Sequence, residues 1–483
     1  MSYEKVRNVL LENNVKWVLC AFTDIRGIFQ SFSTPATNFT EDSKYIDVGI
    51  GFDGSSIRGF KSIHESDMIF FPDPDALYIL PWTEGEHKTA VIIGDIREPY
   101  GSAEPSDVDP RGYVAKRALE EAKKMGYVPT FGPEVEFFVF KSIDPTKLAY
   151  DRYVSPNGGS GDSWGPPRVI PVSAEMNNGG YCLRPKEAYF RNAPEDSTVD
   201  FRNETCEKLI QMGYKIEMHH HEVAANGQVE LNFSYGDMIT TADRVQVYKM
   251  ACRNIAYKHG LIATFMPKPI YLDNASGMHV HNALFNNGTN VFYDEDDEYA
   301  ELSQTARYYI GGLIDHAKAL TAICAPTVNS YKRLVPGFEA PVNIMYSKRN
   351  RSALVRIPVY LRGPKYAMRR RIEYRGCDPS CNPYLAFAAL LSAGLDGIKK
   401  KKEIGDPVDF DVYEMTPQEK TDFNIAQLPT TLKDALDELS TDEVLQRALG
   451  SHVYDAFMDY KTNEWNQFCL YVTPWEIMKY IDY

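Results

Sequence analysis

The sequence lacks any apolar run of the roughly 18 residues that a membrane-spanning helix requires. Its first residues are charged, and no apolar stretch of the kind found in a signal peptide follows them. We therefore expect a cytoplasmic protein without a membrane partner. Basic residues are also in deficit, since the net charge is −14. Because non-specific binding to nucleic acid requires an excess of Lys and Arg, we expect no nucleic-acid partner.

Cysteine is scarce, with eight residues in 483 and no CxxC motif. This density is far below that of a disulfide-stapled domain, so the cysteines are predicted to be reduced thiols. Cys377 and Cys381 form the one close pair. Because two further ligands for a zinc ion are missing beside them, we interpret them as loop cysteines.

The composition is that of a folded enzyme, with 44% apolar and 24% charged residues. A chain of 483 residues exceeds the size at which one core keeps growing. Residues 1–105 alternate short apolar runs with turns, which predicts a small strand-rich domain. The stretch 99–110 is rich in Gly, Ser, Asp and Pro and leads into the second domain, 106–483.

The second domain mixes strand-like and helix-like patterns, so the predicted class is α+β. Expected strands cover residues 134–140, 215–222 and 229–233. Expected helices cover residues 111–125, 305–324 and 384–400. Residues 150–167 carry many glycines and prolines, which predicts a long exposed loop.

Glu134 and Glu136 stand two apart in an otherwise apolar strand pattern. Their side chains therefore share one face, with Cα atoms about 7 Å apart. Buried carboxylates are costly unless they are paired or bind a metal, and clustered oxygens suit Mg²⁺ or Mn²⁺. A solvated strand face is the alternative that this segment alone leaves open.

The same chemistry recurs further along the chain. Glu222 follows three histidines, His219 to His221, and Glu230 lies on the next predicted strand. His279 and His281 share one face of a strand near Asn274. Taken singly, each histidine could equally be a core residue, but the number of carboxylates and imidazoles indicates a metal site.

Arginines crowd into one part of this acidic chain, around Glu373. Guanidinium groups bind phosphates and carboxylates in a bidentate manner, so the cluster predicts a pocket for such anions. Ion-paired surface positions are the alternative, above all for Arg349 and Arg369. The cluster comprises Arg333, Arg349, Arg351, Arg356, Arg362, Arg369, Arg370, Arg371 and Arg375.

The segment 49–54 fits the pattern GxGxxG, which is typical of dinucleotide-binding domains. No amphipathic helix pattern follows it, and no βαβ unit surrounds it. We therefore expect a tight loop that presents Asp53 and Ser56 rather than a Rossmann site.

Several long motifs resemble bacterial and archaeal type I glutamine synthetase, and the resemblance spans essentially the whole chain. The matching segments are 52–56, 134–136, 220–222, 268–269, 274–279 and 329–337. The resemblance implies a small N-terminal β-grasp-like domain and a large catalytic domain with an antiparallel sheet and surrounding helices. It also implies ATP-dependent ligation of ammonia to L-glutamate through a γ-glutamyl phosphate.

The resemblance implies two or more Mg²⁺ or Mn²⁺ ions per site, with ATP as a co-substrate. One ion would be held by Glu136, Glu222 and Glu230. The second would be held by Glu134, His279 and Glu373. These ions would organise glutamate and neutralise charge during phosphoryl transfer.

The same resemblance implies the positions of the substrates. Glutamate would contact Asn274, Ala275, Arg333, Glu339 and Arg375. ATP would contact His281, Arg351, Arg356, Lys365 and Arg371. Ammonium would contact Asp53, Ser56, Tyr189, Glu222 and Glu339. The implied catalytic residues are Asp53, which would accept a proton, together with Glu339 and Arg351.

Family assemblies are dodecamers of two stacked hexamers, in which the Asp53 loop serves a neighbouring subunit's site. This expectation comes from the resemblance alone. A regulatory protein or 2-oxoglutarate would be a further partner, the latter suggested by Arg168, Arg184 and Arg191.

The chain departs from the family pattern at several positions. Ala275 replaces a glycine beside the glutamate site, and Glu187-Ala188 replaces Gly-Gly before Tyr189. Ser62 and the segment around Tyr413 match neither known regulatory subtype well, so feedback inhibition and adenylylation stay open. Two other functions also stay open: a γ-glutamyl ligase for polyamines or other amines, and a catalytically silent family member.

Overall fold

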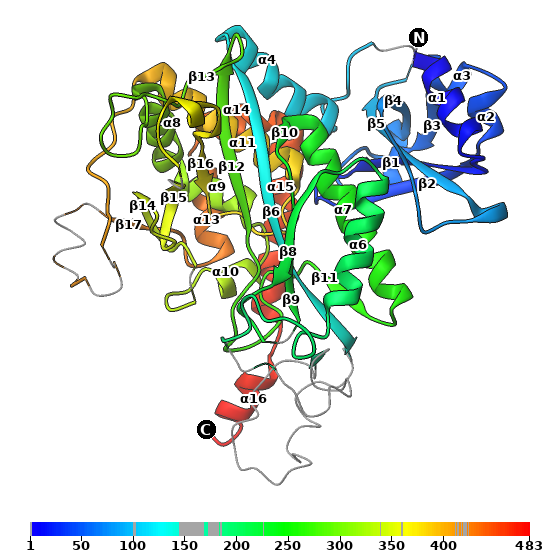
Figure 1. Cartoon of the computed structure of the whole chain (residues 1–483). Coiled ribbons are helices and arrows are strands. Elements are labelled where there is room, and N and C mark those ends of the chain that lie inside the picture. The colour runs from blue at the N-terminus through cyan, green and yellow to red at the C-terminus, as the bar shows by residue number, and fades with distance from the viewer. Residues whose placement is uncertain are drawn as a thin grey trace.

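The computed structural model describes residues 2–99, 103–143, 169–171, 183, 186–225, 227–338, 340–358, 361–410, 412, 415–416, 418, 423 and 425–483. They form a five-stranded sheet near the N-terminus and a larger twelve-stranded sheet surrounded by helices (Figure 1). The α+β class is therefore confirmed. Among the described helices, none combines the length and the apolar character needed to cross a bilayer.

The N-terminal sheet has the strand order β2-β1-β5-β4-β3. Strands β1 and β5 run parallel, and the other neighbours are antiparallel. The strands are β1 (Trp17–Thr23), β2 (Phe29–Pro35), β3 (Ile50–Asp53), β4 (Asp67–Ile79) and β5 (Thr89–Arg97). The helices of this domain are α1 (Ser2–Glu12), α2 (Thr37–Thr40) and α3 (Lys44–Asp47).

The catalytic sheet has the order β17-β14-β15-β16-β12-β6-β9-β8, with four short strands attached to β6 and β12. The main strands are β6 (Val128–Ile143), β8 (Ile216–His221), β9 (Gln228–Phe233), β12 (Met278–Asn286), β14 (Asn343–Lys348), β15 (Ala353–Ile357), β16 (Ile372–Tyr374) and β17 (Ala426–Gln427). The short strands are β7 (Val169–Pro171), β10 (Gly236–Asp237), β11 (Ile262–Thr264) and β13 (Thr289–Asn290). The sheet is mixed, because β14 and β15 are parallel.

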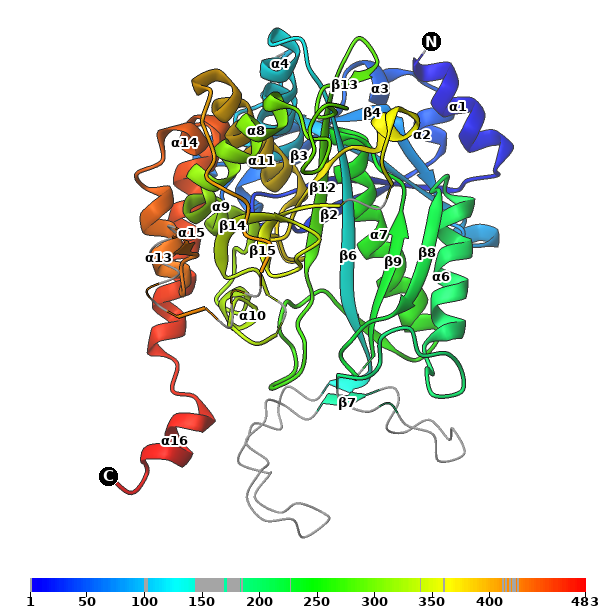
Figure 2. The same cartoon turned by 60° about the vertical axis from the view of Figure 1, so that its left-hand side comes forward.

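Helices pack around this sheet, with α6 and α7 beside β8 and β9 and the C-terminal helices on the far side (Figure 2). They are α4 (Lys116–Lys124), α6 (Val199–Gln211), α7 (Met238–Lys258), α8 (Gln304–Asp315), α9 (Ala317–Cys324), α10 (Ser330–Arg333), α11 (Pro383–Lys400), α13 (Leu432–Leu439), α14 (Glu443–Leu449), α15 (Ser451–Leu470) and α16 (Pro474–Tyr480).

Strand β6 forms the centre of the catalytic domain. Its residues 137–140 are all fully buried, so both faces of this stretch are covered. Phe131 on β6 stacks on Phe387 of α11 with ring centroids 4.8 Å apart. Helix α11 begins where the Asn382 side chain caps the amides of Tyr384 and Leu385. Strand β6, which carries candidate site residues, is therefore held in place by α11.

Two helix predictions need correction. The helix expected over 111–125 begins as a π-helical turn, Pro110–Ala115, before α4. The helix expected over 305–324 is divided into α8 and α9 at His316. The His316 ring nitrogens contact Asp396 at 3.2 Å and Asp442 at 2.6 Å, so side-chain contacts hold the junction.

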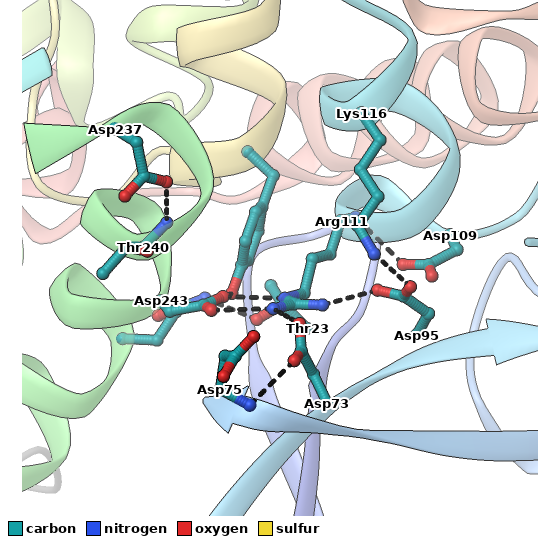
Figure 3. Close-up of polar contacts among 12 residues, drawn as sticks. Thr23, Asp73, Asp75, Asp95, Asp109, Arg111, Lys116, Asp237, Thr240 and Asp243 are labelled. Atoms are coloured by element: carbon teal, nitrogen blue, oxygen red, sulfur yellow. Dashed lines mark hydrogen bonds and ion pairs between the residues drawn. The ribbon is translucent and has the colours of Figure 1, made fainter. Parts of the chain in front are cut away.

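Arg111 joins the two domains at a buried junction (Figure 3). Its guanidinium donates to Asp95 of β5 at 2.6 Å and to Asp73 of β4 at 2.7 Å. It also donates to both oxygens of Asp243 on α7, at 2.8 and 2.9 Å. One buried cation therefore serves three carboxylates from separate parts of the chain. Burial, and then the charge of nearby Asp95, raises the pKa of Asp109 to about 7.

Candidate functional site

Neighbouring strands bring the predicted site residues into register on the catalytic sheet. Glu136 of β6 pairs with Glu230 of β9, which in turn pairs with His220 of β8. On the other side of β6, Glu134 pairs with His279 of β12. His281 of β12 pairs with Glu373 of β16, and Glu373 with Arg356 of β15. Residues from positions 134 to 373 thus meet across six strands.

His220, Glu222 and Glu230 form the tightest group. One ligand atom from each lies within 4.8 Å of the others. The two ring nitrogens of His220 lie 3.5 Å from a carboxylate oxygen of Glu222 and 3.5 Å from one of Glu230. Burial, and then the charge of Glu136, raises the pKa of Glu222 to about 8. Burial, together with neighbouring glutamates, also raises the pKa of Glu230. These carboxylates therefore lack sufficient counter-charge.

A divalent cation fits this group because it would supply the missing charge. His220 was absent from the predicted ligands, although it belongs to the quoted histidine run. Alternation along a strand would have found it, since residues 220 and 222 share one face. Gln228 was also missed, and no sequence pattern pointed to it. It donates to Glu136 and to the carbonyl of Ala275, both at 3.1 Å.

Glu136 is held by β12 and the loop before it. Its Oε2 accepts from the amide of Gly277 at 2.9 Å, and its Oε1 lies 3.3 Å from Nε2 of His279. Burial opposes ionisation, but His279 outweighs it and lowers the pKa of Glu136. Nδ1 of His279 is buried and has no hydrogen-bond partner in the described part of the chain. An unpaired buried imidazole nitrogen is a suitable metal ligand.

The second predicted ligand group is already paired within the chain. Glu134 contacts Nε2 of His281 at 2.9 Å. The two oxygens of Glu373 accept from Arg356 and Arg375, each at 2.5 Å. Burial opposes ionisation of Glu373, but Arg375 and its neighbours outweigh it and hold the pKa well below the usual range. Glu373 is therefore an ionised carboxylate between two arginines.

The predicted glutamate residues lie beside this pair. Arg333 is buried and donates to the carbonyl of Arg375 at 3.1 Å. Its Nη1 has no hydrogen-bond partner among the described residues. Asn274 is also buried, and its amide is fixed by the Asp273 side chain at 2.9 Å. Arg333 thus retains a buried donor for a ligand carboxylate.

A cavity of about 760 Å³ is lined by Glu134, His281 and residues 369–371. Lys215, Asn232 and Tyr235 are also among its lining residues. The volume is in the range typical of nucleotide-sized ligands. Arg371 donates to His281 at 3.2 Å, and these two predicted ATP residues line the cavity.

Three further predicted ATP residues are outside this cavity lining. Arg356 is paired with Glu373, and Lys365 is exposed after Gly363. Arg351 is exposed and interacts with the hydroxyl of Tyr189. Burial, followed by the charge of Glu222, raises the pKa of that hydroxyl. Tyr189 packs edge-on to His220 at 5.3 Å, which places it beside the metal-type cluster.

Asp53 and Ser56 are elsewhere on this chain. Asp53 ends β3 at the edge of the N-terminal sheet and is exposed. Its carboxylate accepts from the hydroxyls of Ser55 and Ser56, both at 2.6 Å, which lowers its pKa. The tight loop predicted over residues 49–54 needs correction, because Ile50–Asp53 form strand β3 and the turn lies at Gly54–Ser56. No hydrogen bond or ion pair in the described residues joins Asp53 to Tyr189 or Glu222.

Some predictions fall outside the described residues: Glu339, the 150–167 loop, Arg168, Arg184 and Tyr413. Arg191 is exposed and donates to the carbonyl of Glu187 at 3.2 Å. Ser62 is also exposed.

Comparison with known proteins gives matches over nearly the full chain. Two family models, "Glutamine synthetase, beta-Grasp domain" and "Glutamine synthetase, catalytic domain", match residues 14–99 and 107–480. A glutamine synthetase of Archaeoglobus fulgidus is 58% identical over 99% of this chain and 97% of its own. One from Sulfolobus acidocaldarius is 46% identical, over 98% and 97%.

Solved structures of similar proteins superpose on nearly the whole chain. A complex of GmaS with ADP superposes with a TM-score of 0.80 at 31% identity, covering 99% of both chains. The glutamine synthetase of Plasmodium falciparum gives a TM-score of 0.83 at 26% identity, covering 99% of this chain and 98% of its own. From the matched models and these full-length identities, the chain belongs to the glutamine synthetase family.

Proposed function

We propose that the chain joins ammonia to L-glutamate at the expense of ATP, through a γ-glutamyl phosphate, and releases glutamine, ADP and phosphate. One observation carries the proposal. The buried carboxylates of the catalytic sheet adjoin a nucleotide-sized cavity, which Glu134 lines, and a buried arginine pair, Arg333 and Arg375, suited to a carboxylate substrate. An amino acid with an anionic side chain and a polyphosphate would thus meet at the cations between them.

Two or more Mg²⁺ or Mn²⁺ ions would occupy the carboxylates. His220, Glu222 and Glu230 would hold one ion, with Glu136 nearby. Glu134, His279 and Glu373 would hold the second, on the nucleotide side. The bound ions would neutralise phosphate charge in the transfer step. Because arginines occupy both oxygens of Glu373 in this structure, one of them must turn toward the phosphates when an ion binds.

The remaining residues would bind and orient the substrates. Arg333, Arg375, Asn274 and Ala275 would hold glutamate. The phosphates and the ribose of ATP would be held by His281, Arg351, Arg356, Lys365 and Arg371. Asp53, Ser56, Tyr189, Glu222 and Glu339 would bind ammonium, with Asp53 taking its proton. Since Asp53 has a lowered pKa, it is ionised at neutral pH and able to attract the cation.

The ammonium residues require a second subunit in this proposal. Asp53 and Ser56 belong to residues 1–105, and the rest belong to residues 106–483. We therefore assign Asp53 to the site of a neighbouring subunit, within a dodecamer of two stacked hexamers in the cytoplasm. Exposed apolar side chains at the C-terminus, where α16 projects from the body (Figure 2), support self-association. They include Leu470, Val472, Trp475 and Ile481.

The test of the reaction is phosphate release from ATP by the purified protein. We expect full release only when both glutamate and ammonium are present, with an equal amount of glutamine formed. Matched reactions with polyamines and small primary amines replace the ammonium. Release that depends on such an amine would identify an amine ligase instead, and no release under any condition would identify a silent family member. Titration of 2-oxoglutarate into the same assay tests it as an effector, and unchanged activity would exclude it.

A further inference from the structure

A second cavity, of about 630 Å³, lies where the N-terminal sheet meets α7 of the catalytic domain (Figure 1). It is lined by residues of β1, β2 and the turn between them, by α7, and by residues 264–267 and 327–329. Gln246 of α7 joins the two domains here, since its side chain donates to the hydroxyl of Thr23 at 2.9 Å and to the carbonyl of Gly27 at 3.2 Å. Among the described residues, none lines both this cavity and the one at Glu134. The two cavities are therefore separate.

Two basic residues of α7, Lys249 and Arg253, line this second cavity. They stand four positions apart, so they share one face of the helix. Lys249 is buried, with 6% of its surface exposed. Its ammonium donates to the carbonyl of Pro379 at 2.6 Å, its one acceptor in the described part of the chain. Because an ammonium carries three donors, two donors of this buried cation remain for a ligand.

The charges of Lys249 and Arg253 lack a carboxylate partner. Neither forms an ion pair among the residues that the structure describes, and both instead lie over the Phe265 ring, at 5.8 and 5.1 Å from its centroid. Burial lowers the pKa of Lys249 to about 8, and burial also lowers the pKa of Arg253. Positive charge is thus held in the cavity wall without sufficient negative charge beside it.

The other charged side chains that line the cavity are already paired. Arg26 donates to Asp24 at 2.5 Å. The two oxygens of Glu464 accept from Lys461 at 2.8 Å and from the amide of Val328 at 3.2 Å. The charge that remains for a ligand is therefore positive, and it comes from the two basic residues of α7.

Much of the remaining lining is apolar. It includes Leu19, Ala21, Val91, Met250, Phe265 and Val328. Apolar walls with a few polar groups at one place, in a cavity of this size, are typical of sites for small organic molecules.

We propose that this cavity binds a small organic anion. Its charged group lies on Lys249 and Arg253, and its apolar body packs against β1 and the adjoining part of α7. The site is separate from the proposed reaction and does not depend on it. An anion here would use the two free donors of Lys249 and would neutralise both cations.

The test is calorimetric titration of the purified full-length protein with benzoate, which carries a carboxylate on an apolar ring. We expect saturable binding at one site per chain. Acetate lacks the apolar body and benzyl alcohol lacks the charge, so each should bind at least about tenfold more weakly. Arg253→Met and Lys249→Met should each raise the dissociation constant of benzoate about ten- to a hundredfold, which corresponds to the loss of a charged hydrogen bond.

Arg244→Met is the matched control. Arg244 belongs to the same helix and lies 5.6 Å over the Tyr214 ring, but it does not line the cavity. This variant should bind benzoate as the wild type does. If Lys249→Met does not fold, Arg253→Met decides alone, because the Arg253 side chain is exposed.

Three results would overturn the inference. The first is the absence of saturable benzoate binding to the wild type. The second is a wild-type dissociation constant in Arg253→Met. The third is displacement of benzoate by excess L-glutamate, because it would place the anion at the buried arginine pair of the candidate site instead.

Discussion

Glu136 and Glu230 are direct cross-strand partners in a buried part of the sheet. Like charges in this position repel one another, and His220 opposite Glu230 is the nearest imidazole in register. Burial lowers the pKa of His220, so the ring is neutral at pH 7 and cannot compensate the charge. The arrangement is stable at low cost only with a bound cation, which gives it a measurable signature.

Glu230→Gln is expected to change stability only when metal is present. In EDTA the raised pKa of Glu230 keeps its carboxyl protonated and uncharged, so a neutral amide of the same shape should leave the melting temperature almost unchanged. With Mn²⁺ at about a hundred times its Kd, the free energy of unfolding of the wild type should rise by roughly 2.7 kcal/mol. The free energy of unfolding of the variant should rise clearly less. Differential scanning fluorimetry measures the melting temperature in EDTA and its increase with Mn²⁺. Glu207→Gln, exposed on α6, is the control and should respond as the wild type does. Equal metal stabilisation of both proteins would contradict the assignment.

Glu136→Ala is expected to abolish glutamine formation. The variant removes a carboxylate beside the cluster and leaves the amide of Gly277 without its acceptor. Glu136→Gln keeps the shape of the side chain and an acceptor oxygen, so it should preserve the loop but still lose activity. Steady-state assays and Mn²⁺ titration by calorimetry separate loss of metal from loss of fold. Turnover at the wild-type rate in Glu136→Ala would refute the metal assignment.

Arg111→Met should loosen the junction between the domains. It leaves Asp73, Asp95 and Asp243 without their shared cation, and breaking a buried ion pair costs about 3–5 kcal/mol. Lys116→Met is the matched control, because Lys116 also pairs with Asp95 but is 37% exposed. It should cost no more than about 1 kcal/mol. Urea unfolding, monitored by fluorescence, provides both values, and equal costs would count against a special role of Arg111.

His316 predicts a pH dependence of stability. Burial favours the neutral ring, but hydrogen bonds with Asp442 and Asp396 outweigh it and raise the pKa above the ordinary 6.5. The resulting stability is fully present below pH 6.5 and is lost as the pH rises through the higher folded-state pKa. His316→Asn should therefore be less stable than the wild type by roughly 1–3 kcal/mol at pH 5.5.

The difference should shrink toward pH 8.5. Lys400 also pairs with Asp396, and it keeps its charge throughout this window because its pKa is raised. Melting curves of both proteins at half-unit pH steps test this. A gap that is constant from pH 5.5 to 8.5 would show that the ring acts only through packing.

Removal of residues 471–483 is expected to yield a smaller assembly with a correctly folded subunit. These residues contribute exposed apolar side chains and few contacts to the body of the chain. Mass photometry would show the assembly, and circular dichroism the fold. The double substitution Trp475→Ser/Ile481→Ser is the full-length counterpart and should act in the same direction. An unchanged mass distribution in both would rule out this segment as an assembly contact.

Local pattern was sufficient for the parts of the site that lie on one strand. The two-residue spacing placed Glu134 and Glu136 on one face of β6, and the structure has them there. The spacing could not decide which residues cluster, because strand pairing is non-local. The register between β8 and β9 contains an irregularity between Ile216 and Met218, which no pattern in the sequence indicated.

Contacts over long sequence distances account for the other differences. Arg111 meets Asp243 across 132 positions, so its role as a junction could not be deduced from its place in a helix pattern. The break at His316 depends on Asp396 and Asp442, which belong to α11 and to the start of α14. Propensity alone favoured an uninterrupted helix there.

The six-strand register has a consequence for how the chain is made. Glu134, Glu136, Glu222 and Glu230 come from β6, β8 and β9, or directly follow β8, whereas Arg356 and Arg375 lie on or after β15 and β16. A ribosome therefore delivers four negative charges of this sheet well before the first of these arginines. Until these arginines are synthesised, the carboxylates of the growing sheet lack their positive charge, and divalent ions in the surrounding solution can supply it.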